Sequence, residues 1–211
     1  MISLRGVGHV YSDGTPWAHR ALTGVDIDIG EKERLLVVGK NGSGKSTLAW
    51  ILAGLIAPSE GSATIDGQDL ADARGTVAIS FQHARLQLFR PTVSEDVRFG
   101  LPLSRDAADV ALRTVGLDPA VFRDRRIDEL SGGEQRRVAL AGMLVRLPRL
   151  VVFDEPFAGL DGPSRRLLIR VIAALPSATV VVSHDYEDAG RFADRVLELR
   201  DGALVREAGI G

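Results

Sequence analysis

Residues 39–47 read Gly-Lys-Asn-Gly-Ser-Gly-Lys-Ser-Thr and fit the pattern G-x-x-x-x-G-K-S/T. A buried-type strand over Arg34–Val38 leads into them, and apolar residues at helical spacing follow over residues 46–55. Glycines let backbone N–H groups converge on a phosphate where a Cβ atom would obstruct them, and the helix start adds its dipole. The stretch therefore predicts a phosphate-binding loop, with a plain glycine-rich turn as the alternative.

Within this loop, Lys45 is expected to reach the β- and γ-phosphates of a nucleotide, and the Ser46 hydroxyl is expected to bind Mg²⁺. The loop alone leaves a kinase, a GTPase and a transport ATPase open. The residues expected to hold the nucleotide are Gly39, Asn41, Gly42, Ser43, Gly44, Lys45, Ser46 and Thr47.

Two carboxylates, Asp154 and Glu155, directly follow the apolar run Leu150–Phe153. Ligands of an open parallel sheet bind at the carboxyl ends of strands, so both side chains are expected to face the nucleotide. We expect Asp154 to face Mg²⁺ through a water, and Glu155 to orient or deprotonate the attacking water. On its own, a strand ending in Asp-Glu is more often a strand that meets a turn, and the phosphate loop favours the functional interpretation.

The composition is that of an ordinary soluble protein, with 45% hydrophobic and 26% charged residues among 211. The net charge of −2 gives no basic field that would indicate nucleic acid. The lack of cysteine excludes disulfides and is compatible with a cytosolic location. No apolar run approaches the ~20 residues of a spanning helix, and the start lacks a secretory signal. We therefore expect any work at a membrane to proceed through a partner.

Alternation of strand and helix patterns predicts an α/β fold with a mostly parallel sheet. Short β-branched runs in residues 2–30 predict an antiparallel β subdomain, and a hairpin around Asp201-Gly202 closes the chain. We expect a single domain over residues 1–211. It consists of a P-loop NTPase core, at 1–82 and 146–211, and an inserted α-helical subdomain at 83–145.

The stretch Leu130-Ser131-Gly132-Gly133-Glu134-Gln135 resembles the signature of ABC ATPases. Further parts of that family occur here in the expected order across nearly the whole chain. In sequence order, the parts are the loop at 39–47, Gln82, the signature at Ser131, Asp154-Glu155, Gly159-Leu160-Asp161 and His184.

The resemblance implies that two such chains form a head-to-tail dimer around two ATP molecules. Ser131, Gly132 and Gly133 would then contact the γ-phosphate held by the other chain, and Asp161 would lie in a loop that crosses the interface. Small residues at a helix start offer N–H donors and a hydroxyl for such a contact. A plain helix N-cap is the other interpretation, and both can hold together.

Two single residues receive their roles from the resemblance alone. Gln82 is similar to the family residue that touches Mg²⁺ and the attacking water and senses the membrane partner. His184 is similar to the switch histidine that hydrogen-bonds the γ-phosphate. The catalytic set implied is thus Glu155, His184, Gln82 and Lys45, with ATP and Mg²⁺ as ligands.

Tyr11 is the best candidate for stacking on adenine, because it lies near the end of the first predicted strand, as the aromatic residue of the family does. A half-buried strand tyrosine is the alternative. Trp17 is the weaker candidate for the same contact.

The segment from Phe81 to Gly100 resembles the energy-coupling-factor (ECF) subgroup of ABC importers, which often carry Gln-Leu-Phe after the glutamine and an Asp in the Thr-Val stretch. The resemblance implies a short helix over Leu86–Phe89 that lines a groove for a transmembrane coupling subunit. Ala84-Arg85-Leu86 departs from the acidic residues that often precede Gln-Leu-Phe. Vitamin and transition-metal uptake are both open as functions.

The implied setting is the cytoplasmic face of the membrane, with a second ATPase chain, identical or not, a transmembrane coupling subunit, a substrate-binding membrane protein and no nucleic acid as partners. A soluble ABC ATPase that acts on DNA or ribosomes is the rival function, but coiled-coil insertions and basic arms are missing from the sequence. A non-hydrolysing clamp is disfavoured by Glu155 and His184. Without the C-terminal extension of many ECF members, we expect weak dimerisation unless ATP or the membrane partner is present.

Overall fold

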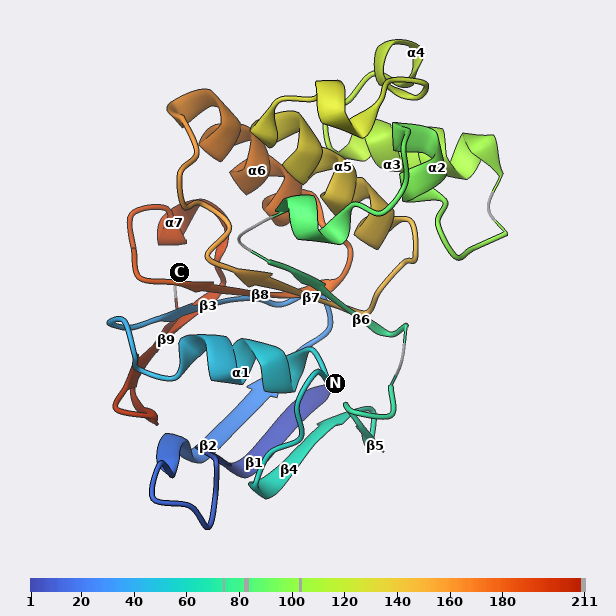
Figure 1. Cartoon of the computed structure of the whole chain (residues 1–211). Coiled ribbons are helices and arrows are strands. Elements are labelled where there is room, and N and C mark those ends of the chain that lie inside the picture. Colours follow the sequence, from blue (N-terminus) through green and yellow to red (C-terminus); the bar gives the residue numbers. More distant parts are fainter. Residues whose placement is uncertain (74, 82–83, 103, 210–211) are drawn as a thin grey trace.

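The structure is a computed structural model that describes residues 1–73, 75–81, 84–102 and 104–209 (Figure 1). The strands are β1 (Ile2–Tyr11), β2 (His19–Ile29), β3 (Arg34–Val38), β4 (Glu60–Ile65), β5 (Gln68–Asp69), β6 (Val77–Ser80), β7 (Leu150–Asp154), β8 (Ala178–Ser183), β9 (Arg195–Arg200) and β10 (Ala203–Gly209). The α-helices are α1 (Lys45–Leu52), α2 (Val93–Val97), α3 (Arg105–Thr114), α4 (Pro119–Phe122), α5 (Gly132–Leu144), α6 (Gly162–Ala174) and α7 (Ala189–Phe192), and the 3-10 helices are η1 (Ala84–Gln87) and η2 (Ile127–Glu129).

The central sheet has the strand order β10-β9-β3-β8-β7-β6. The pairs from β9 to β6 are parallel, and the β9–β10 hairpin is antiparallel. Because the parallel strands all point the same way, the segments that follow β3, β7 and β8 leave the sheet at one edge. Ligand sites of open α/β sheets lie at this edge.

Strand β3 shows how the sheet separates two cores. Leu35 and Val37 pack into the cluster that contains α1, whereas Leu36 and Val38 pack into the cluster that contains α5 and α6. All four side chains are buried. A strand covered on both faces needs apolar residues at every position, which is why β3 reads as a continuous apolar run.

A second sheet, of order β2-β1-β4-β5, is antiparallel. Helix α1 lies between this sheet and the central sheet (Figure 1). Its side chains Leu48, Ile51 and Leu52 are buried there. The antiparallel sheet therefore packs against α1, the helix that follows the phosphate loop.

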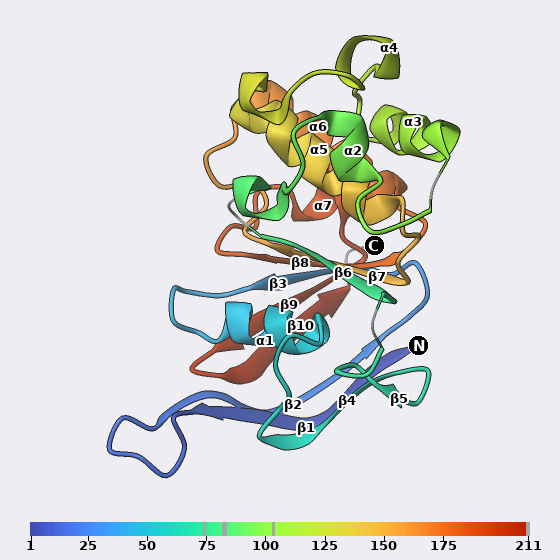
Figure 2. The ribbon, with the colours of Figure 1, turned by 45° about the vertical axis from the view of Figure 1, so that its right-hand side comes forward.

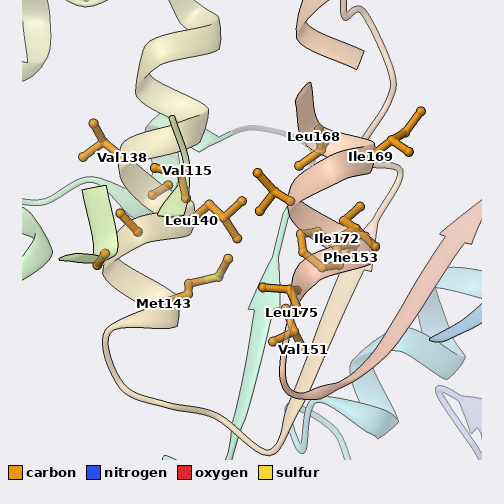
Figure 3. Packing of buried hydrophobic residues seen from close by; sticks show 14 of the residues in the cluster. Val115, Val138, Leu140, Met143, Val151, Phe153, Leu168, Ile169, Ile172 and Leu175 are labelled. Carbon is orange, nitrogen blue, oxygen red and sulfur yellow. The ribbon is translucent and has the colours of Figure 1, made fainter. Parts of the chain in front are cut away.

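The helices α2 to α6 lie on the opposite face of the central sheet (Figure 2). Leu140 and Met143 of α5 face Leu168 and Ile172 of α6, and Phe153 of β7 lies beneath them (Figure 3). Burial of one such side chain contributes about 1.5–3 kcal/mol, so this cluster fixes the signature helix to the sheet that carries the acidic pair.

The predicted α/β fold with parallel core, antiparallel β sheet and helical insertion is confirmed, while the division at residues 82 and 145 remains a prediction. Helix α1 ends at Leu52 instead of Leu55, because Gly54 takes a φ of 67° and stops the helix. Helix α6 begins at Gly162, because the Asp161 side chain caps it.

The short helix expected over Leu86–Phe89 is placed differently, because η1 spans Ala84–Gln87 and Phe89 lies beyond it. The backbone N–H groups of Phe89 and Arg90 instead donate to the buried carboxylate of Asp96, at 2.6 and 2.9 Å. No helix among the described residues is long and apolar enough to cross a bilayer.

Candidate functional site

The loop predicted to bind phosphate, residues 39–47, connects β3 to α1 at the carboxyl edge of the central sheet. Gly42 and Gly44 have φ angles of 80° and 98°, which glycine adopts without strain. A Cβ atom on Gly39 would lie 2.3 Å from the carbonyl oxygen of Leu199. The glycines are thus required by the path of the loop and by its close packing.

Lys45 is the first residue of α1, and its ammonium group is directed back into the loop. Its Nζ donates to the carbonyl oxygens of Gly39 and Lys40, at 2.8 and 3.0 Å. The residue is only 6% exposed. A buried ammonium needs such partners, so the loop itself fixes the position of this charge.

The two aromatic candidates for adenine stacking have different surroundings. The hydroxyl of Tyr11 lies 3.2 Å from Oγ1 of Thr47 in α1, and its ring packs edge-on against His9. Trp17 is 80% exposed in the connection between β1 and β2. Tyr11 is therefore fixed beside the loop, although its contact with adenine remains a prediction.

Ser46 and Asp154, both expected to bind Mg²⁺, lie together. The Ser46 hydroxyl donates to Oδ1 of Asp154 at 3.3 Å, at the end of β7. Burial raises the pKa of Asp154 above its usual range, and repulsion from Glu155 adds to this, against the opposing effects of Ser46 and Lys45. The positive charges near the Asp154 carboxylate do not offset its burial. Together with the Ser46 hydroxyl, this carboxylate forms a set of oxygen donors that suits Mg²⁺.

Glu155 and His184 meet across two neighbouring strands. Nδ1 of His184 lies within hydrogen-bonding distance of Oε2 of Glu155, at 2.9 Å. The backbone of Glu155 has a φ of 48°, and its N–H donates to the carbonyl oxygen of Val182 in β8. Such left-handed backbone costs free energy outside glycine and is commonest where function requires a side chain to be aimed.

Strand register explains why these segments converge. Val38 of β3 lies opposite Ser183 of β8, and Val182 of β8 lies opposite Asp154 of β7. The phosphate loop, the histidine segment and the acidic pair therefore leave adjacent strands at the same level. Gln82, the remaining predicted catalytic residue, follows β6 and lies outside the described residues.

The signature residues begin helix α5. The Ser131 hydroxyl accepts from the N–H of Glu134 at 3.3 Å, and the Glu134 carboxylate accepts from the N–H of Ser131 at 2.7 Å, which is a capping box. Gly132 is exposed, with open space where a Cβ atom would stand. Helices α5 and α1 lie on opposite faces of the central sheet, and no hydrogen bond or ion pair of the described residues joins the signature to the phosphate loop (Figure 2).

Asp161 lies beside the signature of the same chain. Its carboxylate caps α6 by accepting from the N–H of Ser164 at 3.0 Å, and hydrogen bonding from the side chain and the backbone of Ser164 lowers the pKa of Asp161. A Cβ atom on Gly133 would lie 3.7 Å from the hydroxyl oxygen of Ser164. The first turns of α5 and α6 are therefore neighbours on one surface.

Two arginines that we did not predict contact the segments that follow Glu155 and His184. Nη1 of Arg136, in the signature helix, donates to the carbonyl oxygen of Pro156 at 2.9 Å. Arg165, in α6, donates to the carboxylates of Asp185 and Asp188. Nothing in the sequence distinguishes these arginines from the other charged residues of their helices.

The model of the ABC transporter family matches residues 22–158, which include the phosphate loop, the signature and the acidic pair. The chain belongs to the ABC transporter family. The resemblance predicted from the motif order is thereby confirmed, and this chain is an ABC ATPase.

This ABC ATPase is 48% identical to an uncharacterized ABC transporter ATP-binding protein of Mycobacterium tuberculosis, over 98% of its own length and 31% of that relative. The chain thus spans less than a third of that protein. It is 42% identical to the energy-coupling factor transporter ATP-binding protein EcfA2 of Symbiobacterium thermophilum, with coverage of 96% and 76%. Among solved structures, the dimeric cassette MJ0796 bound to ADP and Pi has a TM-score of 0.87 at 29% identity, with coverage of 100% and 99%.

Proposed function

We propose that the chain binds ATP with Mg²⁺ and hydrolyses it as one half of a dimer that drives a membrane transporter. The observation that carries this proposal is the convergence of the phosphate loop, Asp154, Glu155 and His184 at one edge of the sheet. These segments come from three adjacent strands and supply a cationic, a metal-binding and a proton-accepting group together.

The loop accounts for binding of the phosphates. Glycines leave its N–H groups open, α1 contributes the positive end of its dipole, and Lys45 adds a full positive charge inside the loop. Tyr11 supplies the aromatic face for adenine beside Thr47. These elements select a nucleoside triphosphate, because they combine a polyphosphate site with a site for a base.

Mg²⁺ would be held by the Ser46 hydroxyl and, through a water, by Asp154, with Gln82 as a further oxygen donor. The 3.3 Å spacing of the first two groups and the unneutralised carboxylate fit a small hard cation. When bound, the ion draws negative charge from the phosphate oxygens.

Glu155 would accept a proton from the water that attacks the γ-phosphorus, as the bond to the leaving β-phosphate oxygen breaks. His184 orients the Glu155 carboxylate through their 2.9 Å contact and offers its other ring nitrogen to the γ-phosphate. The strained backbone at Glu155 supports this assignment, because it aims the side chain into the site.

The signature supports a site shared between two chains. Ser131, Gly132 and Gly133 are exposed or half-exposed at the start of α5, while α5 and the helix that follows the chain's own phosphate loop, α1, lie on opposite faces of the sheet. A second chain placed head to tail would bring its signature over this loop, and Asp161 would lie at the same interface. The dimeric form of the similar cassette MJ0796 supports this arrangement.

The likeness to an energy-coupling factor ATPase supports an ECF-type importer of a vitamin or a transition-metal ion. The partners would be a transmembrane coupling subunit and a substrate-binding membrane protein, which would hold the chain at the cytoplasmic face of the membrane. The exposed rings of Phe89 and Phe99, with Arg90 stacked on Phe99, offer a surface for the coupling subunit.

The decisive experiment removes the proton acceptor without removing the nucleotide site. In Glu155→Gln, we expect turnover to fall at least about 100-fold, since general bases contribute 10²–10⁴ in rate. ATP affinity and ATP-dependent self-association, followed by light scattering, should be retained. Glu31→Gln, at an exposed residue of the opposite edge, is the matched control. Full hydrolysis by Glu155→Gln would contradict the proposal.

A further inference from the structure

Arg165 lies in the first turn of α6, where its backbone N–H donates to the carbonyl oxygen of Asp161 at 2.9 Å. Its guanidinium contacts the segment that follows His184. Nη2 donates to Oδ2 of Asp185 at 2.8 Å, and Nε donates to Oδ2 of Asp188. One side chain thus holds two carboxylates of the histidine segment by hydrogen bonds, and its Nη2 lies 3.4 Å from a third, that of the exposed Glu187.

These ion pairs are partly withdrawn from water. Asp188 is only 4% exposed, and its other oxygen accepts from Arg191 at 3.0 Å. Buried carboxylates are retained only with charged or hydrogen-bonding partners, and Arg165 and Arg191 supply these partners to Asp188. The hydrogen bond from Arg165 also lowers the pKa of Asp185 below its usual value.

The same guanidinium reaches the segment after Glu155. Its central carbon lies 5.3 Å from the centre of the Phe157 ring, within the range of a cation–π contact. Phe157 follows Glu155 by two residues, and Asp185 follows His184 directly. Arg165 therefore contacts both of the segments whose side chains meet at 2.9 Å in the Glu155–His184 pair.

We propose that Arg165 is a positioning residue that holds the His184 segment against the Glu155 segment, and that its place in the first turn of α6 ties this pair to the position of Asp161. The inference rests on the proposed function, because it names a residue that acts through the groups assigned to hydrolysis. A movement of Asp161 at a dimer interface would shift the helix that carries Arg165, and with it His184.

The position of Arg165 determines which step it affects. The phosphate loop is held by β3, α1 and the β9–β10 hairpin, none of which Arg165 contacts through a hydrogen bond or ion pair in the described part of the chain. Loss of Arg165 should therefore leave ATP binding intact and slow the chemical step. A misplacement of about 1 Å at a catalytic group can cost about 100-fold in rate.

The test compares Arg165→Gln with Arg165→Lys, and with Arg170→Gln as the control at an exposed arginine of the same helix. We expect Arg165→Gln to lower kcat at least about tenfold with KM for ATP changed less than about twofold, which is the pattern of a lost transition-state interaction. Arg165→Lys should have a higher kcat than Arg165→Gln, because an ammonium keeps the positive charge. Its kcat should stay below that of the wild type, because an ammonium cannot contact both carboxylates and the Phe157 ring together. Arg170→Gln should match the wild type.

A second variant avoids the risk that a buried carboxylate without its partner unfolds the chain. Asp185→Asn weakens the contact with the histidine segment and leaves the pair of Arg165 with Asp188 in place, so we expect its melting temperature to stay close to that of the wild type while kcat falls. The imidazole signals in a ¹H–¹⁵N spectrum report on the surroundings of each histidine ring, independently of activity. The His184 signal should shift in Asp185→Asn and Arg165→Gln, whereas those of His9 and His19 should not.

The outcomes separate the two proposals. Unchanged kcat in both Arg165→Gln and Asp185→Asn, or an unchanged His184 signal, would overturn the positioning role while the ATPase assignment stood. An equal loss of ATP affinity and kcat in the folded variants would overturn it as well. Absence of hydrolysis by the wild type, with its membrane partner supplied, would contradict the proposed function instead, and the His184 signal would still decide the role of Arg165.

Discussion

The hydroxyl of Ser46 donates to the carboxylate of Asp154 at 3.3 Å, although 108 residues separate them. The contact joins the first turn of α1 to the end of β7, so the two expected metal ligands lie side by side. A hydrogen bond of this length is weak, and Mg²⁺ would provide a stronger reason for the two groups to lie together.

Removal of Mg²⁺ tests this relationship. We expect EDTA to abolish hydrolysis by the wild type and to weaken ATP binding, and Asp154→Asn to reduce the gain in ATP affinity that Mg²⁺ provides. Titration of a fluorescent ATP analogue with and without Mg²⁺ measures this gain. A full Mg²⁺ effect in Asp154→Asn would exclude the carboxylate from the metal site.

The shared site can be tested by complementation between two defective chains. Lys45→Ala should weaken ATP binding, because it removes the positive charge inside the loop, while Ser131→Arg should block the signature and leave the loop intact. Each variant alone should be inactive. Mixed together, they should regain part of the wild-type ATPase rate, because a mixed dimer combines an intact loop from one chain with an intact signature from the other. No recovery in a mixture shown to form dimers would argue against a site built from two chains.

The aromatic contact to adenine distinguishes Tyr11 from Trp17. Stacking of a base on an aromatic ring is worth about 1–3 kcal/mol, so Tyr11→Ala should weaken ATP binding about fivefold or more. Tyr11→Phe should bind nearly as the wild type does, because it loses only the contact with Thr47. If Trp17→Ala rather than Tyr11→Ala reduces the affinity in equilibrium titrations, the assignment is reversed.

Each motif could be predicted because its residues are adjacent in the sequence. The distances between the motifs in the folded chain could not be predicted in this way. The loop at residues 39–47 can be recognised from glycine spacing, and the end of β7 from an apolar run before two carboxylates. The approach of Glu155 to His184 depends on β7 and β8 being neighbours, and this strand order is set by tertiary packing. The helix start at Gly162 could have been predicted from Asp161 and the following proline, which are ordinary capping signals.

Other features of the site have no local signal at all. The contacts of Arg165 require that α6 and the segment after β8 lie side by side, and one helix pattern does not reveal this. The end of η1 before Phe89 has a nearer cause, because Asp96, six and seven residues further along the chain, accepts from the backbone N–H groups of Arg90 and Phe89. These hydrogen bonds hold Phe89 outside the short helix that the family resemblance implied.

Asp96 gives the chain a pH-dependent contribution to its stability. Burial raises the pKa of Asp96 above its usual range, against the opposing effects of two backbone N–H groups and of Arg85 and Arg90. Because the folded pKa is raised, this carboxyl group stabilises the fold below its unfolded pKa, and that contribution is lost as pH rises through the folded pKa. We therefore expect the wild type to lose stability relative to Asp96→Asn over this pH range.

Chemical denaturation between pH 3.5 and 8 measures the difference. Asp96→Asn keeps an oxygen acceptor for both N–H groups, whereas Asp96→Ala leaves them without one and should cost about 1–3 kcal/mol at neutral pH. A stability difference between wild type and Asp96→Asn that does not change with pH would show that Asp96 keeps an ordinary pKa.

The ammonium of Lys45 already has the carbonyl oxygens of Gly39 and Lys40 as partners. A nucleotide that enters the loop therefore competes with the backbone of the protein for this charge and does not simply neutralise a free one. Part of the attraction between the ammonium and the phosphates is offset, because the two hydrogen bonds to the backbone must be released or shared. This offset limits the affinity for the nucleotide. The same two bonds are available again when the products depart, so the loop can pass through many cycles without leaving a bare cation in its interior.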